Sequence, residues 1–95
     1  MHARVAFFKL KSGSLEEVVE QVESEDGLLS IFRRQQGFAS YELIETGSGL
    51  ISVSHWDSME QANAADRAGA EWAAAHIDEL ATLRQSDTGR VALAS

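Results

Sequence analysis

The stretch ARVAFFKLK, residues 3 to 11, decides the fold of this chain. It is rich in Val and Phe and holds no turn residue, which is typical of a β-strand. Both pleat faces are apolar, with Val5 and Phe7 on one face and Ala6, Phe8 and Leu10 on the other. The strand is therefore expected to be covered on both sides.

A helix in two pieces is expected after this strand. Ser14 and Glu17 form a capping box after the turn residues KSGS, and Leu and Val follow at helical spacing. The run SEDG, residues 24 to 27, interrupts this pattern. A shorter helix then resumes and is expected to end in two arginines before Gly37, because basic residues and a glycine suit a helix C-terminus.

The second half of the chain predicts a hairpin, a long helix and a closing strand. SYELIE and LISVSHW are strand-like and near enough to pair across the turn TGSG. Asp57 or Ser58 caps the next helix, which is expected to run to about Leu83. After the loop QSDTG, the segment RVALAS, residues 90 to 95, is expected to form the last strand.

This order predicts a single α+β domain over residues 1–95, a ferredoxin-like βαββαβ fold with an antiparallel sheet. Right-handed crossovers place the first and third strands in the middle and both helices on one face. The apolar residues on the other face of the first strand then need a cover of their own. A second copy of the chain is the simplest one, so a homodimer is expected.

Composition excludes several classes of function. The net charge is −7 and the eight basic residues are scattered, so nucleic acid and anionic membranes are poor partners. There is no cysteine, which removes disulfides, thiolate metal sites and thiol nucleophiles. No apolar run approaches the roughly 20 residues that span a bilayer, and no leader precedes the first strand, so a soluble, cytoplasmic protein is expected. The acidic residues between 16 and 26 are interpreted as a solvated helix face.

The order of elements resembles the dimeric α+β barrel superfamily, and most closely the antibiotic biosynthesis monooxygenase (ABM) domain. The residues that carry the likeness are VAFFKLKSG, the pair GF at 37 and 38 before SYELIE, ISVSHW, and DSMEQANAADRAGAEWAAAH. The resemblance implies oxidation of a polyphenolic or anthrone-like molecule by molecular oxygen, without metal, flavin or any other cofactor. An electron-rich phenol, once deprotonated, can reduce oxygen itself, so the protein supplies a base, a pocket and donors for the developing anion.

The candidate site lies on the second helix, in the run EWAAAHIDEL at 71–80. Trp72 and His76 are about 40° apart on a helical wheel, and His76 falls at the middle of the face expected to be buried. The other residues of this face are Ala62, Ala65, Gly69, Leu80 and Leu83. The opposite, solvated face holds Glu60, Asn63, Arg67, Glu71 and Asp78.

Two interpretations of His76 stay open. In the functional one His76 is a general base or anion-stabilising donor, because imidazole titrates near neutrality. Trp72 and Trp56 are then flat walls for an aromatic substrate, and Phe8, Phe32 and Tyr41 line the pocket. In the other interpretation His76 is a hydrogen-bonded core histidine and the aromatic residues are packing, as helical spacing favours. The resemblance brings the two interpretations to nearly equal weight.

Other candidate sites are weaker. His2 and His55 are expected to be near neighbours beside Asp57, but no tight ligand spacing supports a metal site there. The haem-degrading branch of the superfamily calls for an Asn on the first strand and for a Trp farther ahead of the helix histidine than Trp72 is from His76. This chain has no such Asn, so haem degradation is not favoured.

Two hypotheses about function follow. The first is a cofactor-independent monooxygenase acting on an aromatic or polyketide-like small molecule, and the second is a non-catalytic barrel that binds a small molecule or serves as an assembly module. The face of the third strand that meets the helices stays undecided, because Leu50, Ser52, Ser54 and Trp56 compete with Ile51, Val53 and His55.

Overall fold

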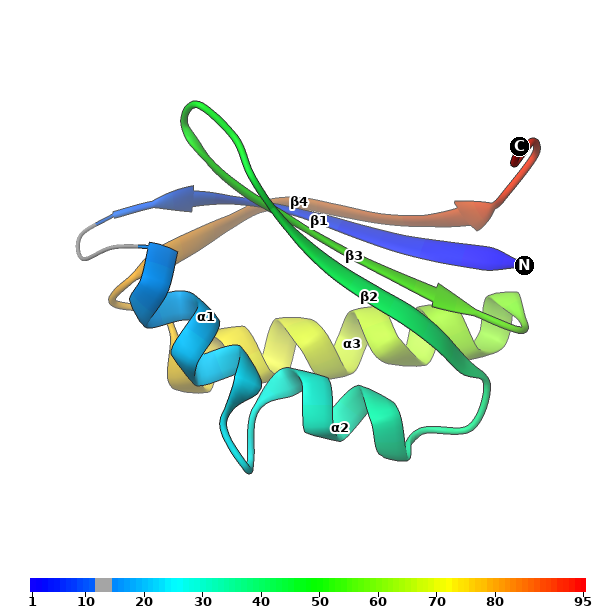
Figure 1. Ribbon diagram of the computed structural model, residues 1–95, viewed down its shortest axis with the longest axis horizontal. Coiled ribbons are helices and arrows are strands. Elements are labelled where there is room, and N and C mark those ends of the chain that lie inside the picture. Colours follow the sequence, from blue (N-terminus) through cyan, green and yellow to red (C-terminus); the bar gives the residue numbers. More distant parts are fainter. Residues whose placement is uncertain (12–14) are drawn as a thin grey trace.

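A computed structural model describes residues 1–11 and 15–95, and Figure 1 shows its arrangement. The elements are β1 (His2–Leu10), α1 (Leu15–Glu23), α2 (Leu28–Arg34), β2 (Phe38–Glu45), β3 (Gly49–Trp56), α3 (Met59–His76) and β4 (Ala81–Arg90). All three helices lie on one face of the sheet, while the other face has no helix over it within the described residues (Figure 1). The two-layer arrangement predicted from the order of elements is confirmed.

The sheet has the strand order β2-β3-β1-β4, so the first and third strands lie in the middle as predicted. Every neighbouring pair is antiparallel, and the central pair β1–β3 keeps one register along its whole length, from His2 opposite Trp56 to Lys9 opposite Gly49. Both edge strands carry an irregularity. The register shifts between Phe7 and Phe8 along β4, and between Phe38 and Ser40 along β2. This ferredoxin-like sheet fixes which side chains face the helices.

The first helical segment follows the apolar pattern in the sequence. Val18 and Val22 are buried on α1, and Leu28 and Phe32 are buried on α2. The interruption at 24–27 separates the two helices as expected, and the predicted Ser14 cap lies outside the described residues. After α2 the chain turns at Gly37, whose φ of 87° lies in the left-handed region that glycine adopts without a steric cost.

The end of the chain differs from the prediction. The predicted cap at Ser58 is confirmed, since its hydroxyl accepts a hydrogen bond from the backbone N–H of Gln61 at 3.1 Å. However, α3 ends at His76 and not near Leu83, and the last strand is Ala81–Arg90 and not residues 90–95. The free edge of β1 offers a full row of backbone partners, and pairing with it overrides the poor strand propensity of ATLRQSDTGR.

The face of β3 left undecided by the sequence is settled by burial. Leu50, Ser52, Ser54 and Trp56 face the helices and are at most 2% exposed. On β1 the helix-facing residues are Arg4, Ala6 and Phe8, all buried. Their neighbours point to the open face, where Phe7 is 40% exposed and Ile44 of β2 is 42% exposed. We call these two surfaces the inner and the outer face of the sheet.

Within the described ranges, no helix has both the length and the apolar character needed to cross a membrane.

Candidate functional site

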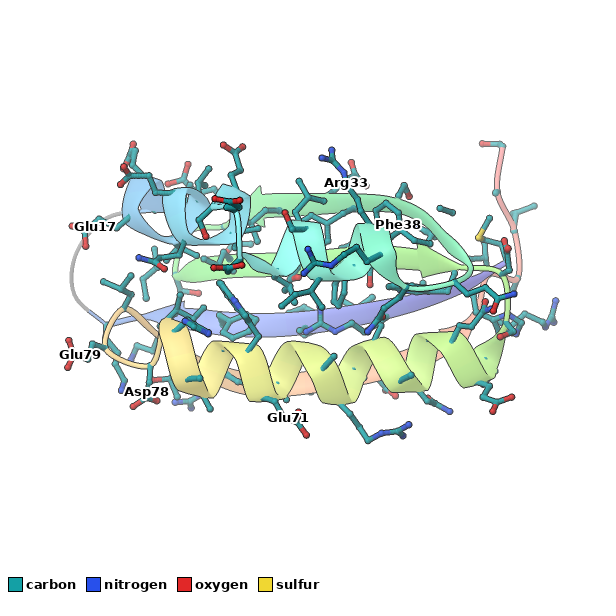
Figure 2. All side chains as sticks on the ribbon, turned by 90° about the horizontal axis from the view of Figure 1, so that it is seen from below. Glu17, Arg33, Phe38, Glu71, Asp78 and Glu79 are labelled. Carbon is teal, nitrogen blue, oxygen red and sulfur yellow. The ribbon has the colours of Figure 1, made fainter. Side chains whose placement is uncertain are left out.

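The inner face of α3 is made of small residues followed by an aromatic one. Ala62 and Ala65 are fully buried, Gly69 is buried, and Trp72 is 6% exposed. The polar residues Glu60, Asn63, Arg67 and Glu71 are exposed, and Figure 2 shows Glu71 projecting from α3 on the side opposite α1 and α2. The predicted orientation of α3 is therefore confirmed as far as Trp72.

His76 does not lie where helical spacing placed it. Its side chain is exposed, and its ring stacks on Trp72 with centroids 5.3 Å apart and planes 27° apart. His76 lies on nearly the same side of α3 as Trp72, as helical spacing predicts. However, α3 ends at His76, so its last turn is not enclosed on every side. His76 lines a hollow of about 450 Å³ together with Gln21, Asp78 and Leu80. The expectation of a buried imidazole is wrong, whereas its chemical role stays a prediction.

The other predicted site residues form an aromatic group beneath α2. Phe32 packs edge to face against Trp56 at 5.3 Å and against Tyr41 at 5.8 Å between ring centroids. Phe32 and Trp56 are fully buried, and the indole N–H of Trp56 donates to Ser54 Oγ at 2.9 Å. Phe8 is buried on β1 and belongs to the same core. The structure thus groups Phe32, Tyr41 and Trp56 around the ring of Phe32. Trp72 and His76 form a separate stacked pair near the C-terminal end of α3.

A residue that the sequence did not single out lies between these groups. Arg4 on β1 is only 1% exposed, although charged side chains are rarely buried so completely. Its Nη1 donates to Ser52 Oγ at 3.0 Å, and that same oxygen lies 2.9 Å from the Tyr41 hydroxyl. The guanidinium carbon is 5.6 Å from the centre of the Phe32 ring, within the range of a cation–π contact. A charged and a phenolic group therefore share one hydroxyl in an otherwise apolar interior.

The counter-charge of Arg4 comes from α3. Asp66 Oδ1 lies 3.5 Å from Arg4 Nε, and the Asp66 side chain is 30% exposed. The other carboxylate oxygen, Oδ2, accepts a hydrogen bond from the Ser86 hydroxyl of β4 at 3.3 Å. Above the guanidinium the helix has Gly69, where a Cβ atom would come within 2.6 Å of Arg4 Nη2. The absence of a side chain at Gly69 is what lets the guanidinium fit beneath α3.

Burial changes the acidity of both ionisable groups in this cluster. It lowers the pKa of the Arg4 guanidinium, while Tyr41 and Asp66 oppose that change. It also raises the pKa of the Tyr41 phenol, against smaller opposing effects of the Ser52 hydrogen bond and the Arg4 charge. Both shifts have the sign expected when a charged form loses its hydration. Tyr41 is therefore held as a neutral phenol that can donate a hydrogen bond.

Two buried N–H groups near this cluster lack a hydrogen-bond partner among the described residues, namely Arg4 Nε and the indole Nε1 of Trp72. Leaving such a donor buried and unpaired costs about 1–3 kcal/mol. Gly69 and Trp72 are three residues apart on α3, which is less than one helical turn. One unpaired donor therefore lies on β1 and the other on the inner face of α3.

The histidine pair predicted as a possible metal site is not formed. His2 pairs with Trp56 and His55 pairs with Ala3 across β1 and β3, so the two rings lie on opposite faces of the sheet. His55 Nδ1 instead lies 3.1 Å from the Ser40 hydroxyl. In residues 1–11 and 15–95, no group of three or more His, Cys, Asp or Glu side chains is arranged to hold a metal ion. The start of β1 and the end of β3 lie side by side as expected, but His2 and His55 point to opposite faces of the sheet.

The fold is shared with a protein of known structure. No protein-family model matches the chain, and no curated protein matches it. Among solved structures, the chain is similar to that of an MhuD mutant crystallised with two manganese protoporphyrin IX molecules bound per active site. The TM-score is 0.68 at 20% sequence identity, and the match covers 100% of this chain and 98% of that chain. At this identity the likeness establishes a common fold.

Proposed function

We propose that this protein is an ABM-like, cofactor-independent monooxygenase that oxidises a small aromatic molecule with molecular oxygen. The observation that carries the proposal is the buried cluster of Arg4, Ser52 and Tyr41 inside an aromatic interior. A fixed positive charge in a place sheltered from water is suited to stabilising an anion that forms during a reaction. The fold shared with MhuD, which binds porphyrins in its active site, supports the binding of a small molecule.

The reaction needs no cofactor if the substrate supplies all the electrons. In an anthrone, the methylene carbon between two aromatic rings becomes a carbonyl, one oxygen atom of O₂ enters the product, and the other leaves as water. Loss of a proton from the substrate produces the electron-rich anion that passes an electron to O₂. The protein's contribution is to remove that proton and to stabilise the anion.

The described residues suggest a role for each of two groups. Arg4 is the donor that stabilises the anion from within the protein. His76 remains our candidate for the base, now at the rim of the hollow near Gln21 and not in the interior. Gly69, which covers Arg4, and His76 are seven residues apart on α3, about 10 Å along the helix axis. A fused aromatic ring system has about this length, and it would reach Arg4 by displacing Trp72, which is 6% exposed.

We further propose that the working form is a homodimer joined through the outer face. The open residues Phe7 and Ile44 are flanked by half-buried Val5, Ile51 and Val53. Four strands about 4.8 Å apart, each of about eight residues, present a plane of roughly 500 Å². This is more than half of the roughly 800 Å² per partner that a standard interface buries.

The test is oxygen consumption with a panel of hydroquinones and anthrones. We expect uptake by the wild-type protein, a loss of at least tenfold in Arg4→Met and in His76→Ala, and no loss in Arg67→Met, which removes a charge from the exposed side of α3. Saturable binding of these compounds without oxygen uptake would instead support the non-catalytic binding barrel. Binding of manganese protoporphyrin IX with a His76-dependent absorption change, together with no response to phenols, would contradict the proposed substrate class.

A further inference from the structure

We infer that Asp66 stands where the anionic group of the ligand binds, so the site takes an aromatic carboxylate or phenolate that competes with Asp66 for Arg4. This inference rests on the proposed interior site, and it extends that proposal by naming the charge of the ligand and an internal competitor. It does not require turnover. Three features of the Arg4 environment support it. The guanidinium has an N–H without a hydrogen bond, its counter-ion Asp66 has a second hydrogen-bond partner, and the residue of α3 next to the guanidinium is a glycine.

The guanidinium of Arg4 is incompletely paired. A guanidinium has five N–H donors in a planar fork, and it binds a carboxylate best through two parallel hydrogen bonds. Here Nη1 donates to Ser52, while Asp66 Oδ1 approaches only Nε, at 3.5 Å. Neither Nε nor Oδ1 has a hydrogen bond in the described residues although both atoms are buried. The ion pair is therefore a single long contact, and a ligand carboxylate could make the bidentate one.

Asp66 is able to leave Arg4 without losing all of its partners. Its side chain is 30% exposed, so water reaches it. Its Oδ2 is already bonded to the Ser86 hydroxyl on β4. A small rotation away from Arg4 would keep that bond and expose the Nε edge of the guanidinium. By contrast, Arg4 is 1% exposed and is held by Ser52 and by the face of Phe32, so it stays in place.

The chain accepts two local costs to keep this arrangement. Gly69 lies inside a helix of 18 residues, where glycine is about 1 kcal/mol less favourable than alanine. Burial of the Arg4 guanidinium is also costly, because the charge loses its hydration. A pair that served only to join α3 to β1 would gain from closer, bidentate geometry. The combination of a glycine, a buried guanidinium and a loose counter-ion fits a site that exchanges one anion for another.

The aromatic part of the ligand follows from the neighbours of Arg4. Phe32 lies under the guanidinium, and Tyr41 shares Ser52 with it. The Tyr41 hydroxyl provides a further neutral donor for an oxyanion. An aromatic acid that places its charged oxygens on Arg4 would insert its ring by displacing these side chains, since Phe32 is fully buried.

The experiment compares the binding of 1-naphthoate with that of its neutral methyl ester, using tryptophan fluorescence and calorimetry. The decisive variant is Asp66→Asn, which keeps the shape and the Ser86 hydrogen bond but removes the competing charge. The matched control is Glu71→Gln, which removes one negative charge from the exposed side of the same helix. Urea unfolding of each variant checks that the fold is retained.

We expect wild-type protein to bind 1-naphthoate at least tenfold more tightly than the ester. Asp66→Asn should tighten naphthoate binding about tenfold, equal to about 1.4 kcal/mol, and leave ester binding unchanged. Glu71→Gln should change neither by more than about twofold, and Arg4→Met should remove the preference for the acid. Arg4→Lys, which keeps the charge but lacks the fork, should retain part of it.

An unchanged or weakened naphthoate affinity in Asp66→Asn would overturn the inference and leave Asp66 as a structural partner. Equal affinity for acid and ester in the wild type would do the same. These outcomes are separable from failure of the proposed reaction. If Asp66→Asn behaves as expected and no phenol consumes oxygen, the anion site stands and the monooxygenase does not. If phenols consume oxygen but naphthoate does not bind, the reverse holds.

Discussion

The two faces of β1 reverse the usual distribution of residues between interior and surface. On the inner face the charged residue Arg4 is 1% exposed, while on the outer face Phe7 is 40% exposed. Both positions are unfavourable in a single chain, since burial of a charge is costly and exposure of Phe forgoes hydrophobic stabilisation. We propose a ligand on the inner face and a second copy on the outer face.

The largest expected effect is a difference in stability between alanine variants of the two phenylalanines of β1. Phe8→Ala should lower the free energy of unfolding by about 3–5 kcal/mol, because it opens a cavity in the helix-covered core. Phe7→Ala removes the same atoms from an exposed position and should cost much less at low protein concentration. Urea unfolding of both variants checks this. Equal losses at concentrations where the protein is monomeric would show that the faces do not differ as described.

The outer face is tested by placing a charge at its centre. Phe7→Glu should weaken self-association by at least 100-fold, because the interface of the proposed pair would bury two further carboxylates. Sedimentation velocity at micromolar concentration measures this, and Lys9→Glu, also exposed on β1, serves as the control at the end of the face. A wild-type protein that sediments as a monomer at these concentrations would remove the proposed dimer.

A smaller effect is expected at the inner face from Gly69→Ala. The added methyl group would lie 2.6 Å from Arg4 Nη2, and the resulting overpacking outweighs the gain in helix propensity by about 1 kcal/mol. Gly47→Ala is the control, because a Cβ at Gly47 meets no atom within 4 Å. Thermal unfolding compares the two. Stabilisation by Gly69→Ala would mean that the guanidinium moves freely beneath α3.

The smallest effect concerns the acidity of Tyr41, the one tyrosine in the chain. Since burial raises its pKa, ultraviolet titration of the folded protein should show phenolate forming above the ordinary value of 10.0. The folded state then holds this proton more tightly than the unfolded state. That contribution to stability is complete below pH 10 and is lost as the pH rises through the folded pKa.

Tyr41→Phe tests this contribution, because the variant keeps Arg4 and lacks only the phenol hydroxyl. Between about pH 10 and 11, the wild-type protein should lose stability faster with pH than the variant does. Parallel pH profiles of the two proteins would show that the phenol is not shielded from water. The same titration in the presence of 1-naphthoate links the result to the anion site, since an anion near Tyr41 should raise its pKa further.

The fold was largely predictable from the sequence because its signals are periodic. The two apolar faces of ARVAFFKLK, the interruption at 24–27 and the SYELIE–LISVSHW pair each predict an element that the structure contains. The last strand was misplaced because RVALAS has the better strand composition. Pairing with the free edge of β1 is a long-range effect that composition does not show, and it selects ATLRQSDTGR instead.

The site was less predictable because the burial of a side chain depends on where its helix or strand ends, as well as on the side from which it projects. His76 points to nearly the same side of α3 as Trp72, but the helix ends there, and the ring is exposed. Arg4 lies near the start of β1 and its burial depends on Gly69, 65 positions later in the chain. A glycine in the middle of a predicted helix was the available signal that something large lies opposite.

The irregular register of both edge strands has a consequence for how molecules of this protein meet. Along β4 the extra residue is Arg84, and along β2 it is Ala39, whereas the central pair is uninterrupted. Such kinks make an edge a poor template for another strand. Growth of the sheet sideways into fibrils is thereby discouraged. Because each extra residue lies outside the pairing, deleting Arg84 should leave every other side chain of β4 on its present side, so the edges can absorb changes in chain length that the centre cannot.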